Sequence, residues 1–283
     1  MLEPALQQTE PEISTRSTTP TNTQQGIGQL KATLKRQDFI SRLQVVGRAL
    51  SSRAATQSLS GILIRSGSEG LSLRATDMEL GLQAELPGQA DGEGSVLVPG
   101  RQLVELARSL GAEEVSLEAR ESEGDIEIRS GSAVFHLRTL PSQDFPRFPE
   151  PEGEPLRIPA AVFTETVELV ARAASRDDMR PVLTGVLVTA AGREMTMVAT
   201  DSYRLSVKRS ELEADLGELD ANVPARALRD LARIVPGEEA ESVEVWLLPN
   251  QAVLRAGSVI QIAWKRVDLV NCDAAFGNIQ LFM

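Results

Sequence analysis

The sequence has few of the residues that build disulfides and metal centres. Cys272 is the only cysteine and His136 the only histidine among 283 residues. A single cysteine excludes a disulfide within the chain and suits a reducing compartment, so we expect a cytoplasmic protein. One histidine and one cysteine cannot build the usual zinc sites, and we expect neither a metal nor a cofactor.

Long apolar runs are also absent. No stretch approaches the ~20 apolar residues of a membrane span, and a hydrophobic content of 42% is ordinary for a soluble globular protein. Residues 1–29 are rich in Gln, Thr, Ser and Pro and contain no apolar stretch. A secretory signal needs such a stretch, so this segment predicts a disordered extension that can be removed without loss of stability.

The chain contains the same pattern twice. Residues 31–140 align with residues 155–265, and the landmarks keep an offset of 124 to 126 residues. The matched landmarks are Phe39 with Phe163, Gly61 with Gly185, Asp77 with Asp201, and Arg101 with Arg226. So small a drift indicates a duplicated domain, not a short solenoid repeat. Each copy is long enough for its own core, and we expect the two to superpose.

Each copy predicts two amphipathic helices and roughly seven strands. In the first copy an apolar stripe runs from Phe39 to Leu50, and Pro99 suits the first turn of a second helix. Gly124 and Gly131 supply turns between closely spaced strands, so those strands are antiparallel. The predicted class is α+β, with helices packed on antiparallel sheets.

The repeat and the composition divide the chain into five parts. The expected parts are an extension at 1–29, a first domain at 30–149, a linker at 150–155, a second domain at 156–266 and a distinct tail at 267–283. The linker reads Glu-Pro-Glu-Gly-Glu-Pro, which is typical of a connection between domains.

Several segments, in their order and spacing, resemble the bacterial DNA polymerase III beta subunit, the sliding-clamp family. They are Ala75-Thr76-Asp77-Met78-Glu79, Val98-Pro99-Gly100-Arg101, Leu137-Arg138-Thr139-Leu140-Pro141, Met179-Arg180-Pro181-Val182-Leu183-Thr184-Gly185 and Ala199-Thr200-Asp201-Ser202-Tyr203-Arg204-Leu205. The resemblance implies duplicated clamp domains of the processivity fold. It also implies a ring around DNA, lined by helices, in which two three-domain chains close head to tail.

The tail departs from that family. After residue 264 the resemblance fades, and residues 267–283 read VDLVNCDAAFGNIQLFM. The family would continue into a third domain, so we expect a truncated, frame-shifted or naturally short form. A heterologous ring closes only when both complementary faces are present, so closure of a two-chain ring is expected to be impaired.

The charge pattern agrees with a DNA-lined hole. The chain carries a net charge of −11, yet the helical stretches at 35–53, 99–110, 160–180 and 224–235 hold 13 basic and 7 acidic residues. Such residues would meet phosphates without reading sequence. The alternative is that these charges only solvate the wet faces of amphipathic helices.

The resemblance also implies site residues. The expected DNA contacts are Arg53, Arg101, Asp177, Arg180 and Arg226. The expected cleft for short linear peptides of the replicative polymerase and the clamp loader comprises Leu183, Thr200, Ser202, Tyr203, Arg204 and Leu205. Ser202-Tyr203 replaces a Gly-His of some family members, so the pocket floor differs in shape. The alternative for Tyr203 and Leu205 is ordinary sheet packing.

No catalytic site is expected. Asp77 and Asp201 end strands at equivalent places, where an aspartate commonly bonds its own backbone. His136 lies in an alternating strand and should face solvent, and Asp177-Asp178 reads as a solvated loop. The chain is therefore predicted to be a non-catalytic, ring-forming clamp that binds double-stranded DNA. The alternatives are an acidic β-rich protein-interaction module that does not encircle DNA and a metal-dependent hydrolase using the two aspartates.

Overall fold

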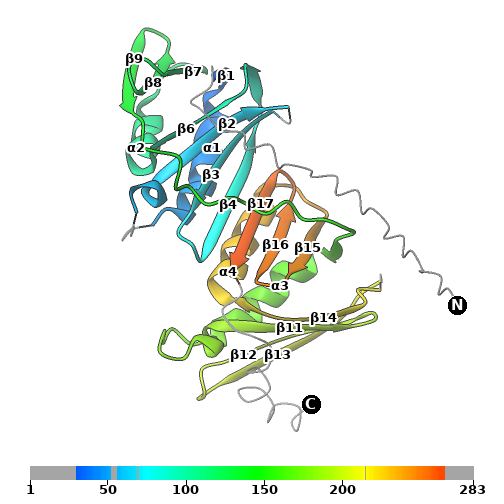
Figure 1. The fold of residues 1–283 in the computed structure, drawn as a ribbon. Coiled ribbons are helices and arrows are strands. Elements are labelled where there is room, and N and C mark those ends of the chain that lie inside the picture. The colour runs from blue at the N-terminus through cyan, green and yellow to red at the C-terminus, as the bar shows by residue number, and fades with distance from the viewer. Residues whose placement is uncertain (1–29, 52–55, 69, 214, 265–283) are drawn as a thin grey trace, which may run out of the picture.

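The computed structural model describes residues 30–51, 56–68, 70–213 and 215–264 (Figure 1). The predicted extension at 1–29, the tail at 267–283 and Arg53 lie outside the described residues. None of the described helices is long and apolar enough to cross a membrane.

The first unit contains two α-helices and nine described strands. Its strands are β1 (Lys31–Lys35), β2 (Gly61–Gly67), β3 (Gly70–Thr76), β4 (Leu80–Leu86), β5 (Gly88–Asp91), β6 (Gly94–Pro99), β7 (Glu114–Arg120), β8 (Asp125–Ser130) and β9 (Ala133–Arg138). Its helices are α1 (Arg36–Val46), which the 3-10 turn η1 (Gly47–Ala49) extends, and α2 (Gly100–Ser109), while η2 (Gln57–Ser60) precedes β2. In α1 the buried Phe39, Leu43 and Val46 follow the helical spacing and face the core.

The second unit repeats this order with two α-helices and eight described strands. Its strands are β10 (Leu156–Pro159), β11 (Gly185–Ala191), β12 (Glu194–Thr200), β13 (Leu205–Glu211), β14 (Glu218–Pro224), β15 (Ser242–Leu248), β16 (Gln251–Ala256) and β17 (Val259–Trp264). Its helices are α3 (Ala160–Val170) with η3 (Ala171–Ala173), and α4 (Ala225–Ile234) with η5 (Val235–Gly237), while η4 (Pro181–Thr184) precedes β11.

The strand pairings confirm the duplication. In the first unit β2 lies between β3 and β6, and in the second unit β11 lies between β12 and β14. The ladder β1-β7-β8-β9 of the first unit recurs as β10-β15-β16-β17. Phe39 in α1 and Phe163 in α3 are both buried, at equivalent positions of equivalent helices. All ladders are antiparallel, which confirms the α+β class.

Two details differ from the expectation. The strand β5 was missed, because its Gly-Gln-Ala-Asp sequence has no alternating apolar pattern, and it pairs only with the edge of β1. Pro99 precedes α2 as its N-cap residue instead of standing within its first turn. Pro159 and Pro224 stand at the same place before α3 and α4. Proline suits this junction because it cannot continue a ladder and fixes φ for the turn into a helix.

One strand from each unit joins the two units. β17 pairs with β4 in antiparallel register, with Ile260 opposite Gln83 and Ala263 opposite Leu80. This pairing merges both units into an eight-stranded sheet (Figure 1). The backbone N–H of Glu85 extends the ladder by donating to the carbonyl of Ser258 at 3.0 Å. The junction is therefore built of main-chain hydrogen bonds as well as side chains.

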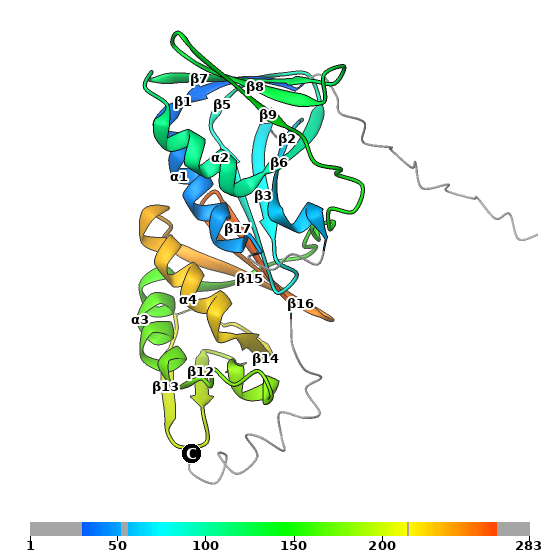
Figure 2. The same ribbon diagram turned by 90° about the vertical axis from the view of Figure 1, so that its left-hand side faces the viewer.

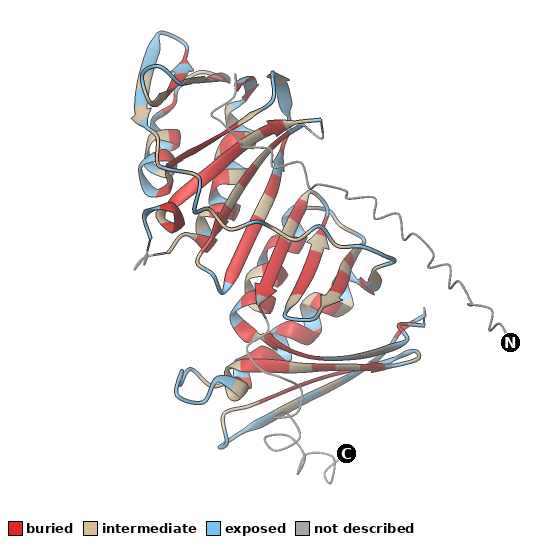
Figure 3. Cartoon of the chain, viewed as in Figure 1, coloured by how far each residue is buried: buried red, intermediate tan, exposed pale blue. Residues whose placement is uncertain are grey.

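The helices occupy one side of the molecule. Figure 2 shows α1, α2, α3 and α4 along one side, with the eight-stranded sheet on the other. Burial is concentrated in the strands of that sheet and in the helix faces turned toward it (Figure 3). The apolar core consequently leaves the outward faces of the helices free to carry charge.

Candidate functional site

Arginines from η1, α2 and α4 stand on the helix side of the molecule. Arg101 and Arg108 of α2 are exposed and, with Arg48 of η1, line a surface depression between α1 and α2. The helix α3 differs, because it has no basic residue and carries Glu165 and Glu168. The positive charge of the helix side therefore belongs mainly to the first unit and to α4.

Arg226, an expected DNA contact, lies at the junction between the units. Its Nη1 donates to Oδ2 of Asp77 at 2.7 Å, and its Nη2 donates to the carbonyl of Arg48 at 3.2 Å. Its Nε also lies 3.8 Å from Oδ2 of Asp230. Because the guanidinium is half-exposed and already paired with a carboxylate, its first physical role is to hold the two units together.

The two aspartates that end β3 and β12 close identical turns. Asp77 Oδ1 accepts the backbone N–H groups of Glu79 and Leu80 at 3.1 and 2.8 Å. Asp201 Oδ1 accepts those of Tyr203 and Arg204, both at 3.0 Å. These hydrogen bonds, above all the one from the backbone N–H of Tyr203, hold the pKa of Asp201 below its usual value. Their geometry confirms the structural role predicted for both aspartates.

The structure brings two of the expected site groups together. Arg180 Nε lies 3.0 Å from Asp177 Oδ2, and its Nη1 donates to Ser202 Oγ at 3.1 Å. The backbone N–H of Met179 and the Arg180 side chain both donate to Asp177, which lowers the pKa of that carboxyl. One arginine therefore links the expected DNA contacts to the expected peptide cleft.

A polar pocket opens at the same place. Its lining residues are Ala174, Ser175, Arg176, Asp177, Arg180, Asp201, Tyr203 and Arg204. Tyr203, one of these lining residues, is 94% exposed, so its ring packs against little of the protein. Three arginines against two aspartates give the pocket a positive balance, which favours contact with acidic groups.

The remaining cleft residues lie beside this pocket and do not line it. Leu183 belongs to η4, and its carbonyl accepts the N–H of Ser175 at 2.8 Å. Thr200 Oγ1 donates to the carbonyl of Arg204 at 2.8 Å and accepts the N–H of Ser202 at 3.1 Å. Leu205 is 45% exposed at the start of β13. Arg176 and Ser175 line the pocket and were not predicted, because they lie in a loop whose path the sequence pattern does not reveal.

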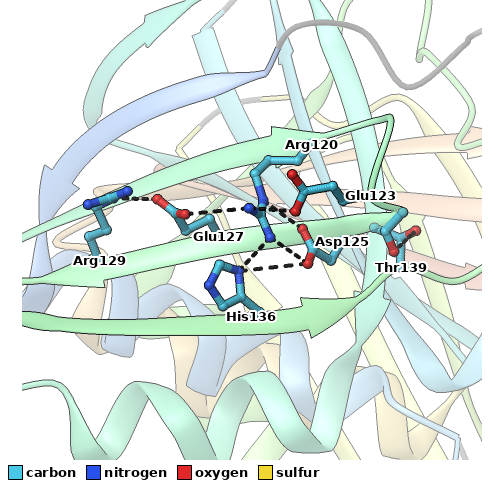
Figure 4. Close-up of polar contacts among 8 residues, drawn as sticks. Arg120, Glu123, Asp125, Glu127, Arg129, His136 and Thr139 are labelled. Atoms are coloured by element: carbon cyan, nitrogen blue, oxygen red, sulfur yellow. Dashed lines mark hydrogen bonds and ion pairs between the residues drawn. The ribbon is translucent and has the colours of Figure 1, made fainter.

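His136 belongs to a charged cluster on the outer face of β7, β8 and β9 (Figure 4). Arg120 donates to both carboxylate oxygens of Asp125, at 2.9 and 2.7 Å, and to Nδ1 of His136 at 2.7 Å. The Arg120 hydrogen bond lowers the pKa of Asp125. His136 Nδ1 also lies 3.7 Å from Asp125 Oδ2, so the ring belongs to this surface charge cluster.

A second charged pair at the junction escaped the sequence analysis. Arg42 of α1 bonds through Nη1 to Glu238 Oε1, and both side chains are largely buried. Ser258 Oγ donates to the other carboxylate oxygen at 2.7 Å. The pair joins residues 196 positions apart, and only the packing of the two units reveals it.

Within the described ranges, no group of three or more His, Cys, Asp or Glu could hold a metal ion.

Comparison with known families accounts for both units. Residues 30–149 match the model of the DNA polymerase III beta subunit, N-terminal domain. Residues 157–267 match the model of the central domain of the same subunit. The order of the two matches is the order of the two units in this fold.

Known relatives and solved structures agree. The beta sliding clamp of Staphylococcus epidermidis is 30% identical over 239 residues, which are 81% of this chain and 63% of the relative. The DNA polymerase sliding clamp of Bacillus subtilis has a TM-score of 0.79 at 24% identity, covering 85% of this chain and 65% of that one. The DNA polymerase III beta chain of Streptococcus pneumoniae has a TM-score of 0.78 at 25% identity, covering 87% and 67%.

The chain thus spans just under two thirds of the length of the curated relatives it matches. Both of its units have their own family match, and the solved clamps share its fold. On these matches, the chain belongs to the DNA polymerase III beta-subunit family, with the family's N-terminal and central domains in sequence.

Proposed function

We propose that this chain acts as a DNA sliding clamp, a processivity factor that encircles duplex DNA and tethers the replicative polymerase without catalysis of its own. The observation that carries the proposal is the pair of consecutive family matches, to the N-terminal and central domains of the DNA polymerase III beta subunit. The relatives that match this chain are themselves named beta sliding clamps.

The helix side is the surface proposed to face DNA. Arg101 and Arg108 are exposed on α2, and Arg233 is exposed on α4. In a chain of net charge −11, arginines gathered on one side offer phosphate contacts while the rest of the surface repels DNA. Such contacts carry no sequence information, which suits a protein that must slide. For Arg226 the proposal is a partial contact, since Asp77 already neutralises much of its charge.

The pocket beside β13 is the proposed docking place for short linear peptides of the polymerase and the clamp loader. Tyr203 offers an exposed ring, and Arg176, Arg180 and Arg204 offer donors for acidic or carbonyl groups. In this proposal Leu183, Thr200, Ser202 and Leu205 shape the rim. The pair Arg180–Asp177 supports the rim by fixing Ser202 through a hydrogen bond.

A DNA-binding measurement tests the proposed surface. The double variant Arg101→Ala with Arg108→Ala should weaken binding to a short duplex at low salt and lower the salt slope by about 2. Arg147→Ala is the matched control, because Arg147 is exposed in the segment between β9 and β10. The neighbouring Phe148 packs on Trp246, Val253 and Ile262 of the sheet, away from the helices. Equal losses in the two proteins would contradict the proposed surface.

Encirclement needs a topological test. A chain that encircles DNA is retained on nicked circular DNA and lost after linearisation, whereas an interaction module that only touches DNA shows no such difference. That closure of a two-chain ring by this polypeptide is impaired stays a prediction, and mass measurement in solution tests it. Retention on circles as a discrete dimer would contradict the impaired closure and support the clamp. No observation on the described residues favours the interaction module or a hydrolase.

A further inference from the structure

The second helix of each unit carries an acid between two arginines. The three residues are Arg101, Glu105 and Arg108 on α2, and Arg226, Asp230 and Arg233 on α4. The spacing is four residues and then three in both helices, so the three side chains share one face of each helix. All four arginines are exposed, and both helices lie on the helix side of the molecule (Figure 2). An acid therefore stands among the bases of the proposed DNA surface in both units.

On α4 the acid lies close to three arginines. The oxygens of Asp230 lie 3.9 Å from Arg48 Nη1, 3.8 Å from Arg226 Nε and 3.7 Å from Arg233 Nη1. The Asp230 side chain is only 14% exposed, whereas that of Arg233 is 68% exposed. Burial raises the pKa of the Asp230 carboxyl, and the surrounding arginines oppose this rise only in part. The carboxylate thus attracts these guanidinium groups without holding any of them in a short bond.

On α2 the acid has the same helical neighbours and is more open to solvent. Glu105 is exposed, and among the described residues its side chain makes no hydrogen bond or ion pair. With Arg48, Arg101 and Arg108 it lines the surface depression between α1 and α2. One carboxylate and three arginines consequently share this patch of the helix side.

Helix stability gives little reason to place an acid there twice. An acid four residues after a base, as in Arg101 and Glu105, has the less favourable order for an ion pair along a helix. Glu105 does precede Arg108 by three residues, yet these two side chains make no ion pair. The exposed Glu105 also covers none of the core.

We propose that Glu105 and Asp230 weaken the hold of their neighbouring arginines on DNA phosphates, so that each contact breaks readily as the chain slides. An acid beside an arginine competes with a phosphate for the same guanidinium group, and the contact becomes weaker without being lost. The inference rests on the proposed function, because it takes the arginines of α2 and α4 as phosphate contacts. It extends that function by giving the acids of this surface a role of their own.

Neutral replacements of nearly equal size test the proposal. Glu105→Gln should bind a short duplex about threefold more tightly at low salt, the effect of one unit charge a few ångströms away in water. Asp230→Asn should bind about tenfold more tightly, because three arginines lie near that carboxylate. Asp230→Asn also removes the contact with Arg48 of the other unit, so its unfolding is measured alongside. Glu105→Gln breaks no bond among the described residues and therefore decides the test.

Glu168→Gln is the matched control. Glu168 is exposed on α3, a helix without basic residues, and its replacement changes the net charge by the same amount. Its duplex affinity should stay within about a factor of 1.5 of that of the unaltered chain, because no arginine of its helix is released. Equal tightening by Glu105→Gln and Glu168→Gln would show an effect of net charge alone and overturns the proposal.

A double-mutant cycle tests whether the acid acts through the arginines. In a background of Arg101→Ala with Arg108→Ala, Glu105→Gln should lose most of its effect, because the groups that it releases are gone. A threefold tightening that persists in this background overturns the proposed route.

The same cycle separates this inference from the proposed function. If Arg101→Ala with Arg108→Ala binds duplex as tightly as the unaltered chain, the proposed DNA surface is wrong and the role of the acids falls with it. If that double variant binds more weakly while Glu105→Gln leaves the affinity unchanged, the DNA surface stands and only the role of the acids is overturned.

Discussion

Arg226 Nη1 lies 2.7 Å from Asp77 Oδ2, so a residue at the start of one unit's second helix bonds the turn after β3 of the other unit. Asp77 Oδ1 meanwhile accepts two backbone N–H groups of its own turn. One carboxylate therefore fixes both the turn and the junction. Arg226, for which the family resemblance implies a DNA contact, therefore makes its strongest contact in this fold with the other unit.

Removal of that arginine should loosen the junction. Arg226→Ala deletes the bond to Asp77 and the bond to the Arg48 carbonyl, and we expect the free energy of unfolding to fall by about 1 kcal/mol, since the arginine is half-exposed. Arg233→Ala is the control. The Arg233 side chain is 68% exposed, and its Nη1 lies 3.7 Å from Asp230 Oδ1, which is a looser contact than the 2.7 Å bond of Arg226. Urea denaturation measures both. Equal effects would mean that the Asp77 bond stabilises nothing.

The buried pair between Arg42 and Glu238 should matter more. Glu238→Ala leaves the Arg42 guanidinium with little solvent and no carboxylate, and its Nε already lacks a partner among the described residues. We expect a loss of about 3 kcal/mol in the free energy of unfolding. The double variant Arg42→Met with Glu238→Leu should recover most of it, because no charge is then left buried. A double variant as unstable as Glu238→Ala would contradict this account.

Much of the fold could be predicted from the sequence because the chain repeats itself. Matched landmarks such as Phe39 and Phe163 fixed the duplication, and the class followed from the alternation of apolar residues. The strand β5 could not be predicted, since Gly-Gln-Ala-Asp is held by pairing with β1 and not by an apolar pattern.

The candidate site was less accessible from the sequence. Local bonds such as those of Asp201 to its own turn follow from residue type and position. The contacts of Arg226 with Asp77 and of Arg42 with Glu238 depend on how two units pack, and residues far apart in the chain meet there. The resemblance to the clamp family implied a DNA contact for Arg226, whereas in the structure its Nη1 lies 2.7 Å from the carboxylate of Asp77.

A strained turn residue should be replaceable by glycine. Met78 has φ of 72° and is 48% exposed, so its side chain adds little packing while its backbone is in the left-handed region. Met78→Gly should raise the free energy of unfolding by about 0.5 kcal/mol, the relief of strain exceeding the entropy that glycine costs. Met179→Gly is the control, at 89% exposure without a positive φ. Thermal melts that show the same change for both would contradict the argument.

The Arg120–Asp125 bond should give a measurable pH dependence. The arginine holds the pKa of Asp125 below the 3.8 of a free aspartate. A carboxyl whose pKa is lower in the folded state adds stability above pH 3.8, and this stability is lost as the pH falls through the folded pKa. Asp125→Asn should therefore flatten the acid limb of the stability curve.

NMR titration of the carboxyl group tests the cause directly. Arg120→Ala should move the Asp125 midpoint back toward 3.8, because the largest cause of its shift is the Arg120 hydrogen bond. Arg129→Ala should move it less, since Arg129 bonds Glu127 and leaves the Arg120–Asp125 bond intact. An Asp125 midpoint that is unmoved by Arg120→Ala would show that another group sets it.

Gly61 and Gly185 recur in the two copies because a side chain from the neighbouring strand passes close to each. A Cβ on Gly61 would lie 2.7 Å from Leu97 Cδ1, and a Cβ on Gly185 would lie 1.9 Å from Asn222 Oδ1. Leu97 and Asn222 occupy equivalent strands, β6 and β14. The repeated glycine is therefore a packing requirement at the first residue of β2 and of β11.

Gly185→Ala should consequently displace Asn222. That side chain is buried, its Nδ2 donates to the carbonyl of Val182 at 3.0 Å, and its displacement breaks this bond and disturbs the β11–β14 ladder. We expect the free energy of unfolding to fall by about 2 kcal/mol. The double variant Gly185→Ala with Asn222→Ala should be more stable than Gly185→Ala alone, because the removed amide leaves room for the new methyl group. If the double variant is less stable than the single, the close approach of Asn222 is not what keeps glycine at position 185.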